Sequence, residues 1–188
     1  RQRTSLYADL RRVLPTGSTP PLPFFDPLNL SKDADEGTIL RWREAELVHS
    51  RVAMLAALGF VVAENFHPLF GGDITGPAIT HAKQIDVNYS VFWKTLLFLI
   101  ALFESSRSAY GSDGRSDKWS LKQDYISRDL ELDPLNVLKG KSDAEVEDMK
   151  NKELNNGRLA MVAITGMIAQ ELAQGESIVD TWRHLLAV

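Results

Sequence analysis

The chain has 188 residues, a formal net charge of −4 and no cysteine. This length fits a single domain, and the acidic balance argues against a nucleic-acid surface. Without cysteine there are no disulfides, thiolate metal sites or thiol nucleophiles. No secretory signal or transit peptide is visible at Arg1, so we expect the chain to be a mature form.

The N-terminal quarter of the chain predicts an irregular arm followed by a long helix. Residues 1–24 are basic and then rich in proline, which predicts the arm. The Asp-Pro-Leu-Asn segment at 26–29 is typical of a turn. A helix is predicted over 38–65, and at 1.5 Å per residue it is roughly 40 Å long. Such a helix crosses a bilayer with some tilt.

The middle of the chain predicts a second, shorter apolar helix. Residues 66–90 contain several glycines and prolines and are predicted to be a loop. An apolar run then predicts a helix over 91–110, with Trp93 suited to a membrane interface. Glu104 and Arg107 lie three residues apart near its end, on one helix face.

The C-terminal part predicts a long helix over 144–174 and a short amphipathic helix over 177–186, suited to a membrane interface. The apolar segments carry charges throughout, so the simplest rule for a membrane span fails. Charged residues inside a spanning helix are nevertheless functional by default when they pair or bind a ligand. We therefore predict an all-α membrane protein with three transmembrane helices and short amphipathic helices.

One unit of the sequence occurs twice. The segment ELVHSRVAMLAALG at 46–59 matches ELNNGRLAMVAITG at 153–166 without a gap, and equivalent residues are 107 positions apart. The same offset places the turn at 26–29 on a second Asp-Pro-Leu-Asn segment at 133–136. Two copies of one unit predict that the first and third helices cross as a pair related by a pseudo-two-fold axis.

Each copy places a Glu and an Arg among small and apolar residues, where an unpaired charge is costly. Glu46 and Arg51 are about 140° apart around one helix axis, so they do not face each other. If the two helices cross, Glu46 meets Arg158 and Arg51 meets Glu153. The small residues of both copies allow the close approach that helix contacts in lipid require.

Three interpretations of this arrangement compete. A di-metal carboxylate bundle needs Glu-x-x-His on two helices, but the second copy has Asn156 where the first has His49. A purely structural role would have paired charges fix the helix crossing. The third interpretation is axial ligation of chlorophyll magnesium, which takes one axial donor in addition to the four tetrapyrrole nitrogens. Imidazole, carboxylate or amide serves, and a paired arginine neutralises a Glu ligand.

The twin motifs resemble the first and third membrane helices of the light-harvesting chlorophyll-binding family, and the resemblance covers most of the chain from about Phe25. It implies that Arg51, Arg158 and Arg107 are the pairing arginines. The chlorophyll ligands that it implies are Glu46, His49, Glu104, Glu153, Asn156, Gln170 and His184. It also implies that the two Asp-Pro-Leu-Asn turns hold carotenoid ends. Leu96 stands where green-plant members often carry a Gln ligand, so that site is not expected here.

Several phrases, such as Phe-Phe-Asp-Pro-Leu and Ile-Thr-Gly-Pro-Ala-Ile, resemble antenna proteins of red-lineage algae. This branch implies chlorophyll a, chlorophyll c and xanthophylls such as fucoxanthin, diadinoxanthin or peridinin. By the resemblance, the chain is a multi-pass protein of the chloroplast thylakoid membrane. Its expected partners are a photosystem core, with photosystem I favoured, neighbouring antenna subunits and membrane lipids.

The sequence therefore predicts a light-harvesting antenna subunit and no enzyme, since no nucleophile–base pair or phosphate loop is visible. An alternative within the family is a stress-related photoprotective quencher that senses acidification. The acidic residues on the predicted lumenal side are Glu64, Asp73, Asp86, Glu171, Glu176 and Asp180. An alternative from another class is a pigment-free helical membrane scaffold.

Overall fold

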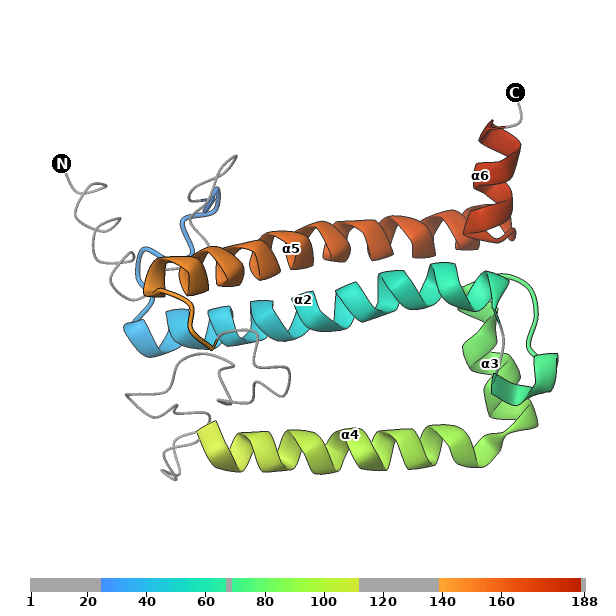
Figure 1. The fold of residues 1–188 in the computed structure, drawn as a ribbon, viewed down its shortest axis with the longest axis horizontal. Coiled ribbons are helices and arrows are strands. Elements are labelled where there is room, and N and C mark those ends of the chain that lie inside the picture. Colours follow the sequence, from blue (N-terminus) through green and yellow to red (C-terminus); the bar gives the residue numbers. More distant parts are fainter. Residues whose placement is uncertain (1–24, 67–68, 112–138, 187–188) are drawn as a thin grey trace. The chain divides into compact units, whose positions relative to one another are not determined.

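The computed structural model describes residues 25–66, 69–111 and 139–186, and every regular element in these ranges is helical (Figure 1). The elements are α2 (Glu36–Asn65), the short 3-10 helix η1 (Leu69–Gly72), α3 (Ala78–Asn88), α4 (Ser90–Gly111), α5 (Asp143–Gln174) and α6 (Ile178–Leu186). The predicted N-terminal arm at 1–24 and the second Asp-Pro-Leu-Asn turn at 133–136 lie outside the described residues.

The chain divides into two compact units. One consists of Arg1–Ser50 and Ser108–Arg158, and the other of Arg51–Arg107 and Leu159–Val188. The first halves of α2 and α5 belong to the first unit, and their second halves belong to the second. The expectation of one light-harvesting domain over 1–188 stays a prediction.

Hydrogen bonds between residues close in sequence mark the start of both long helices. Before α2, Asp35 Oδ1 accepts a hydrogen bond from Thr38 Oγ1 at 2.6 Å. Before α5, Ser142 and Glu145 form a capping box: Ser142 N donates to Glu145 Oε2 at 2.8 Å, and Glu145 N donates to Ser142 Oγ at 3.4 Å. Reciprocal bonds of this kind satisfy N–H groups that have no partner inside the helix.

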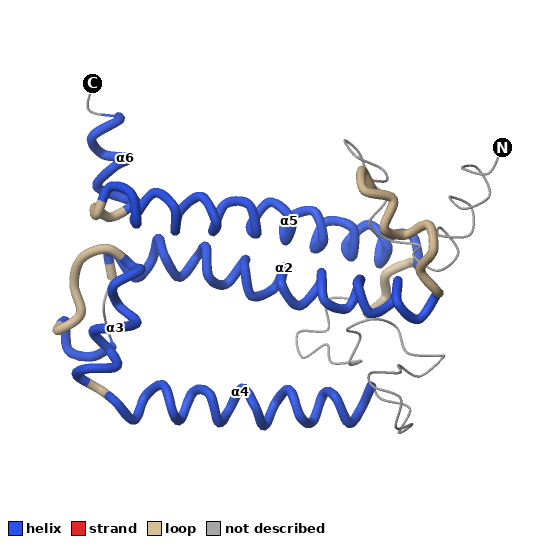
Figure 2. Tube along the Cα trace, turned by 180° about the vertical axis from the view of Figure 1, so that it is seen from behind, coloured by secondary structure: helices blue, strands red, loops and turns tan. Residues whose placement is uncertain are grey.

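In the first unit, α2 and α5 lie side by side (Figures 1 and 2). Leu154 of α5 and Ile39 of α2 are the buried apolar side chains of the described part of this unit. Ser50 of α2 is fully buried, and Gly157 of α5 lies against it. Glycine and serine remove side-chain bulk, so the two backbones approach closely at this point.

In the second unit, the predicted loop over 66–90 is wrong in part, because residues 78–88 form α3. The glycines and prolines that suggested a loop end at Pro77, which takes the N-cap position of α3 without a side-chain cap of its own. Glu171, a distant residue of α5, supplies the missing cap by accepting a hydrogen bond from Ile79 N at 2.8 Å. Local sequence therefore carried no start signal for this helix.

A small aromatic cluster fixes the corner between α3 and α4, which are bent by 107°. Phe70 packs on Tyr89 with ring centroids 4.7 Å apart and on Phe92 at 5.2 Å. Tyr89 donates from its hydroxyl to Asp73 Oδ2 at 2.9 Å. Trp93 Nε1 donates to the carbonyl of Ala82 at 3.0 Å, which ties α4 back to α3.

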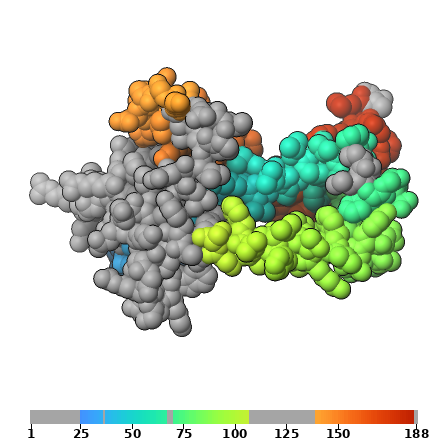
Figure 3. All heavy atoms as spheres, turned by 60° about the horizontal axis from the view of Figure 1, so that its bottom comes forward, coloured from blue at the N-terminus to red at the C-terminus, as the bar shows by residue number. Residues whose placement is uncertain are grey.

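Large apolar side chains are exposed along α2, α4 and α5, and Figure 3 shows the surface of α4 open on the face presented. By length and composition, α2 over Gly37–Asn65 is able to span a membrane, whereas α3 and α4 are long and apolar enough only if they are taken together as a bent pair. The polar residues of α5 make it too polar to count as a span by the same criteria. The prediction of three transmembrane helices therefore remains a proposal. Apolar surface exposed to this extent indicates contact with lipid, a ligand or another protein.

Candidate functional site

Arginines hold both carboxylate oxygens of Glu46. Arg158 Nε donates to Oε1 at 2.8 Å, which joins α2 to α5 as the repeat predicts. Arg43 Nη1 donates to Oε2 at 2.6 Å from one turn earlier on α2. Arg43 was not predicted as a partner of Glu46, although opposite charges three residues apart on a helix indicate such a pair. Each carboxylate oxygen keeps a lone pair for one further partner, and the side chain is 27 % exposed.

The matching pair of the second copy is Arg51 with Glu153. Both side chains take part in polar or electrostatic interactions, and Glu153 is half-buried. Arg51 and Glu153 belong to different units of the chain. Their pairing therefore stays a prediction of the repeat.

The imidazole of His49 is held in one tautomer by its own helix. Nδ1 lies 2.7 Å from the carbonyl oxygen of Ala45, one turn earlier. A carbonyl only accepts, so Nδ1 carries the proton and the lone pair of the neutral ring is on Nε2. Among the described residues, no other group bonds to this ring, and the side chain is exposed. Nε2 is therefore presented to whatever lies against α2, as a ligating histidine requires.

Asn156 occupies the equivalent position in the second copy and is held in the same way. Its Nδ2 donates to the carbonyl of Lys152 at 2.9 Å, again one turn earlier on the helix. The amide oxygen remains as the outward-facing acceptor on an exposed side chain. Two different residue types thus present one lone pair each at equivalent positions of the repeat.

Apolar surface adjoins both donors. Val52 and Leu55 follow His49 at one-turn steps and are exposed, and Leu159 and Val162 follow Asn156 at the same steps and are exposed too. A hard donor beside an apolar face fits a flat macrocycle with a central Mg²⁺, which takes one axial nitrogen or oxygen ligand. The residues present therefore fit a chlorophyll at each position.

Three other sequence-predicted ligands lie half-buried, one on α4 and two on α5. Glu104 is on α4 directly after the exposed apolar residues Leu102 and Phe103, and it takes part in polar or electrostatic interactions of its own. Glu153 and Gln170 lie on α5, and they belong to different units. The side chain of Arg107, the expected partner of Glu104, lies outside the described part of the chain. The structure does not test these ligand assignments.

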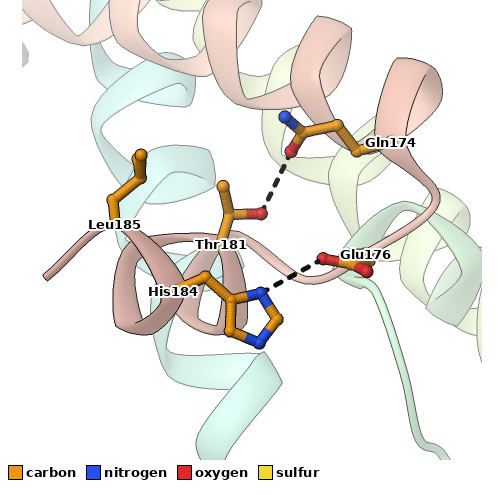
Figure 4. Close-up of a pocket in the computed structure, with 5 residues that line it drawn as sticks. All are labelled: Gln174, Glu176, Thr181, His184 and Leu185. Atoms are coloured by element: carbon orange, nitrogen blue, oxygen red, sulfur yellow. Dashed lines mark hydrogen bonds and ion pairs between the residues drawn. The ribbon is translucent and has the colours of Figure 1, made fainter. Parts of the chain in front are cut away.

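His184 lines an open pocket of about 420 Å³ where α5 ends and α6 begins (Figure 4). Its Nδ1 lies 3.8 Å from Glu176 Oε2, while Thr181 Oγ1 donates to Gln174 Oε1 at 3.1 Å on the pocket wall. A carboxylate near Nδ1 favours a proton there and leaves Nε2 as the donor atom. The exposed side chain of Leu185 supplies apolar surface beside it.

A di-metal carboxylate centre needs several acidic or histidine side chains around one point. Within residues 25–66, 69–111 and 139–186, no three His, Asp or Glu side chains come together in this way. The predicted donors are instead spread singly over α2, α4, α5 and α6. Donors spread in this way suit several bound molecules, each held by one side chain, better than one polynuclear metal site.

Comparison with known proteins identifies the family of the chain. Residues 12–172 match the family model described as chlorophyll A-B binding protein. Over 176 residues the chain is 43 % identical to the chloroplastic light-harvesting complex stress-related protein 1 of Chlamydomonas reinhardtii, covering 90 % of this chain and 68 % of that protein. Over 163 residues it is 46 % identical to stress-related protein 3.2 of the same alga, covering 83 % of this chain and 61 % of that protein.

A third relative comes from a different organism. The chain is 42 % identical over 166 residues to the chloroplastic fucoxanthin-chlorophyll a-c binding protein of Isochrysis galbana, covering 84 % of this chain and 74 % of the relative. The family match spans most of the chain, including both copies of the repeat. The chain therefore belongs to the chlorophyll a/b-binding protein family.

Proposed function

We propose that this chain is a light-harvesting antenna subunit that binds chlorophylls and carotenoids and transfers excitation energy to a photosystem. The proposal rests mainly on His49 and Asn156, which occupy equivalent positions of the repeat and each expose one atom with a free lone pair. Each donor is fixed by a hydrogen bond to its own helix, and each adjoins exposed apolar side chains. Inside a membrane, an acceptor atom on an apolar face is costly unless a ligand or another partner takes it, and a chlorophyll magnesium would do so.

In this proposal the ligating side chains hold the pigments at fixed positions. His49, Asn156 and His184 supply neutral donors, and Gln170 supplies an amide oxygen. Glu46, Glu104 and Glu153 supply carboxylates, of which Glu46 is neutralised by Arg43 and Arg158. Bound chlorophyll supplies light absorption and energy transfer, while the chain sets pigment spacing and surroundings. The proposal assigns the chain no enzymatic step.

The pigment set in the proposal is chlorophyll a, chlorophyll c and a xanthophyll such as fucoxanthin. It is supported by the relative of Isochrysis galbana, whose name includes fucoxanthin and chlorophyll a-c. The turn at 26–29 is proposed to hold one carotenoid end. Asp26 closes this turn by accepting from Leu30 N and Ser31 N, each at 2.9 Å.

We further propose that α2, α4 and α5 span the thylakoid membrane, with photosystem I as the favoured acceptor of energy. The exposed apolar side chains of these helices support a lipid and pigment environment. The polar residues of α5 would be tolerated there because they pair or bind pigment. The two algal relatives named as chloroplastic support the chloroplast as the compartment.

The first experiment is an absorption spectrum of the detergent-purified protein, followed by chromatography of the extracted pigments. Chlorophyll a with chlorophyll c and a xanthophyll would support the antenna proposal and identify the branch. A folded, helical and colourless protein would overturn it and leave the paired charges as a pigment-free scaffold.

A photoprotective role is the second candidate, favoured by the identity to two proteins named as stress-related. In this case the bound chlorophyll would lose its excitation as heat when the lumen acidifies. The test is the chlorophyll fluorescence lifetime of the purified protein as a function of pH. Shortening at low pH that Glu64→Gln with Glu171→Gln removes would support the quencher; a lifetime that does not depend on pH would remove it.

A further inference from the structure

Trp42 lies on the same face of α2 as His49, about two turns earlier in the helix. A separation of seven residues places the two positions about 20° apart around the helix axis and about 10 Å apart along it. Both side chains are exposed, that of Trp42 by 47 %, and both belong to the same compact unit. They therefore share one open surface of α2.

This surface is flat between the two side chains. Ala45 lies there, three residues after Trp42 and four before His49, and it is exposed as well. The imidazole of His49 is held over this turn, because its Nδ1 lies 2.7 Å from the carbonyl oxygen of Ala45. Helical side chains in general lean toward the N-terminus of their helix, which here is the side of Trp42. The small alanine therefore leaves room for a flat ring held at His49 to reach Trp42.

The indole N–H of Trp42 has no hydrogen-bond acceptor among the residues that the structure describes. Trp93 of α4 shows the paired case, since its Nε1 donates to the carbonyl of Ala82 at 3.0 Å. An N–H group that is removed from water without a partner costs free energy, so covered tryptophans usually find an acceptor. Trp42 thus offers one unused donor beside the ligand position of His49.

The second copy of the repeat does not have this donor. Met149 stands at the position equivalent to Trp42, and its side chain has no N–H group. Lys152 stands at the position equivalent to Ala45, and its ammonium pairs with a carboxylate of the same helix at 2.6 Å. The surroundings of His49 and Asn156 therefore differ, although the two donors are held alike.

We propose that Trp42 is a positioning residue for the chlorophyll held by His49, and that its indole N–H donates a hydrogen bond to the keto oxygen at the edge of the macrocycle. This role rests on the proposed function, because it requires a chlorophyll at His49. Every chlorophyll carries this keto group, and its ring is wide enough to cover about two helix turns of 5.4 Å. A single axial ligand leaves the ring free to rotate about the bond to magnesium. A second contact at the rim fixes the orientation of the ring, on which energy transfer depends.

An anchor at the membrane–water interface is the other role that an exposed tryptophan near the start of a membrane helix serves. In that role the indole N–H bonds to water or lipid, and no vibration of a pigment depends on it. Trp182 of α6 has a similar exposure of 45 %, but it lies about 160° around the helix axis from His184. It is therefore the matched control for the pigment contact.

Resonance Raman spectroscopy of the pigment-loaded full chain tests the hydrogen bond, because a bonded keto carbonyl stretches at a lower frequency than a free one. Trp42→Phe keeps an aromatic ring and removes the N–H, so one keto band should move to the frequency of a free carbonyl while the chlorophyll count stays the same. Trp182→Phe should leave every keto band in place. Identical keto bands in the wild type and in Trp42→Phe, both with bound chlorophyll, would overturn the role of Trp42 alone. A wild type without chlorophyll would overturn the proposed function with it.

Two further variants identify the pigment and its place. His49→Leu should lose the low-frequency keto band together with one chlorophyll, and a band that persists would overturn the assignment to the pigment of His49. Ala45→Leu puts a bulky side chain on the flat surface and keeps a good helix former. It should lose either this chlorophyll or its low-frequency keto band. A full chlorophyll count with an unchanged band in Ala45→Leu would refute the placement of the ring between His49 and Trp42.

Discussion

Ser50 and Gly157 are equivalent positions of the repeat, and they are in contact with each other. A Cβ built on Gly157 would lie 2.6 Å from Ser50 Oγ and 3.1 Å from Ser50 Cα. A residue that touches its own symmetry equivalent lies next to the symmetry axis. The pseudo-two-fold axis inferred from the sequence therefore passes between these two residues, which explains why both are small.

Gly157→Ala should lower the free energy of unfolding by about 1–3 kcal/mol, the usual cost of forcing extra volume into a packed contact. Thermal unfolding in detergent, followed by circular dichroism, measures the change. Gly166→Ala on the same helix is the control, because nothing described lies within 4 Å of its Cβ position. That change should be neutral or stabilise the helix by up to about 1 kcal/mol. Equal effects of the two substitutions would contradict a tight contact at Gly157.

Arg158→Leu should destabilise the protein by about 1–3 kcal/mol, because Glu46 loses a charged hydrogen bond between helices. Arg43 remains bonded to the other oxygen, and this keeps the loss below that of a fully stranded buried charge. The matched control is Arg183→Leu, which breaks an exposed pair with Asp180 and should cost less than about 1 kcal/mol. The prediction fails if both variants unfold at the same temperature.

His49→Leu should remove one chlorophyll per chain and leave the remaining pigments in place, as counted by extraction and chromatography. His49→Asn is the conservative variant, since the other copy of the repeat uses an asparagine at this position. It should retain the pigment, because its amide oxygen is also able to ligate Mg²⁺. Val52→Ala, a neighbouring change without a donor atom, should also retain it. A full pigment count in His49→Leu would refute the ligand role.

The turn at 26–29 should loosen in acid. The pKa of Asp26 lies below its ordinary value of 3.8, chiefly because the Ser31 hydroxyl donates to its carboxylate. Because the folded form has the lower pKa, the ionised carboxylate stabilises the turn above about pH 3.8, and this contribution is lost as the pH falls through the lowered value. Ser31→Ala should move the pKa of Asp26 back toward 3.8, as carboxyl NMR titration would show. A titration curve that does not shift would contradict this assignment.

Much of the candidate site is visible in the sequence because charges in apolar helices need partners. The repeat predicted the meeting of Glu46 with Arg158, and the structure contains this ion pair. It did not predict Arg43, because this arginine reaches Glu46 from the same helix and the repeat relates only residues of different helices. The outward lone pairs of His49 and Asn156 depend on hydrogen bonds to the preceding turn, which residue types alone do not specify.

The sequence by itself determined that the chain is built on two equivalent helices, because matched residues at a constant offset impose matched environments. It also determined which residues are able to donate to magnesium, since that property belongs to the side chain. Ser177 supplies a local cap for α6 by accepting from Asp180 N at 3.1 Å, but only the tertiary structure decided which groups accept from Ile79, Ile178 and Val179. Every helix start has backbone N–H groups without an intrahelical partner, whatever its sequence. The sequence near α3 and α6 therefore does not reveal that Glu171 and Glu64 accept from these groups; the path of the chain brings them there.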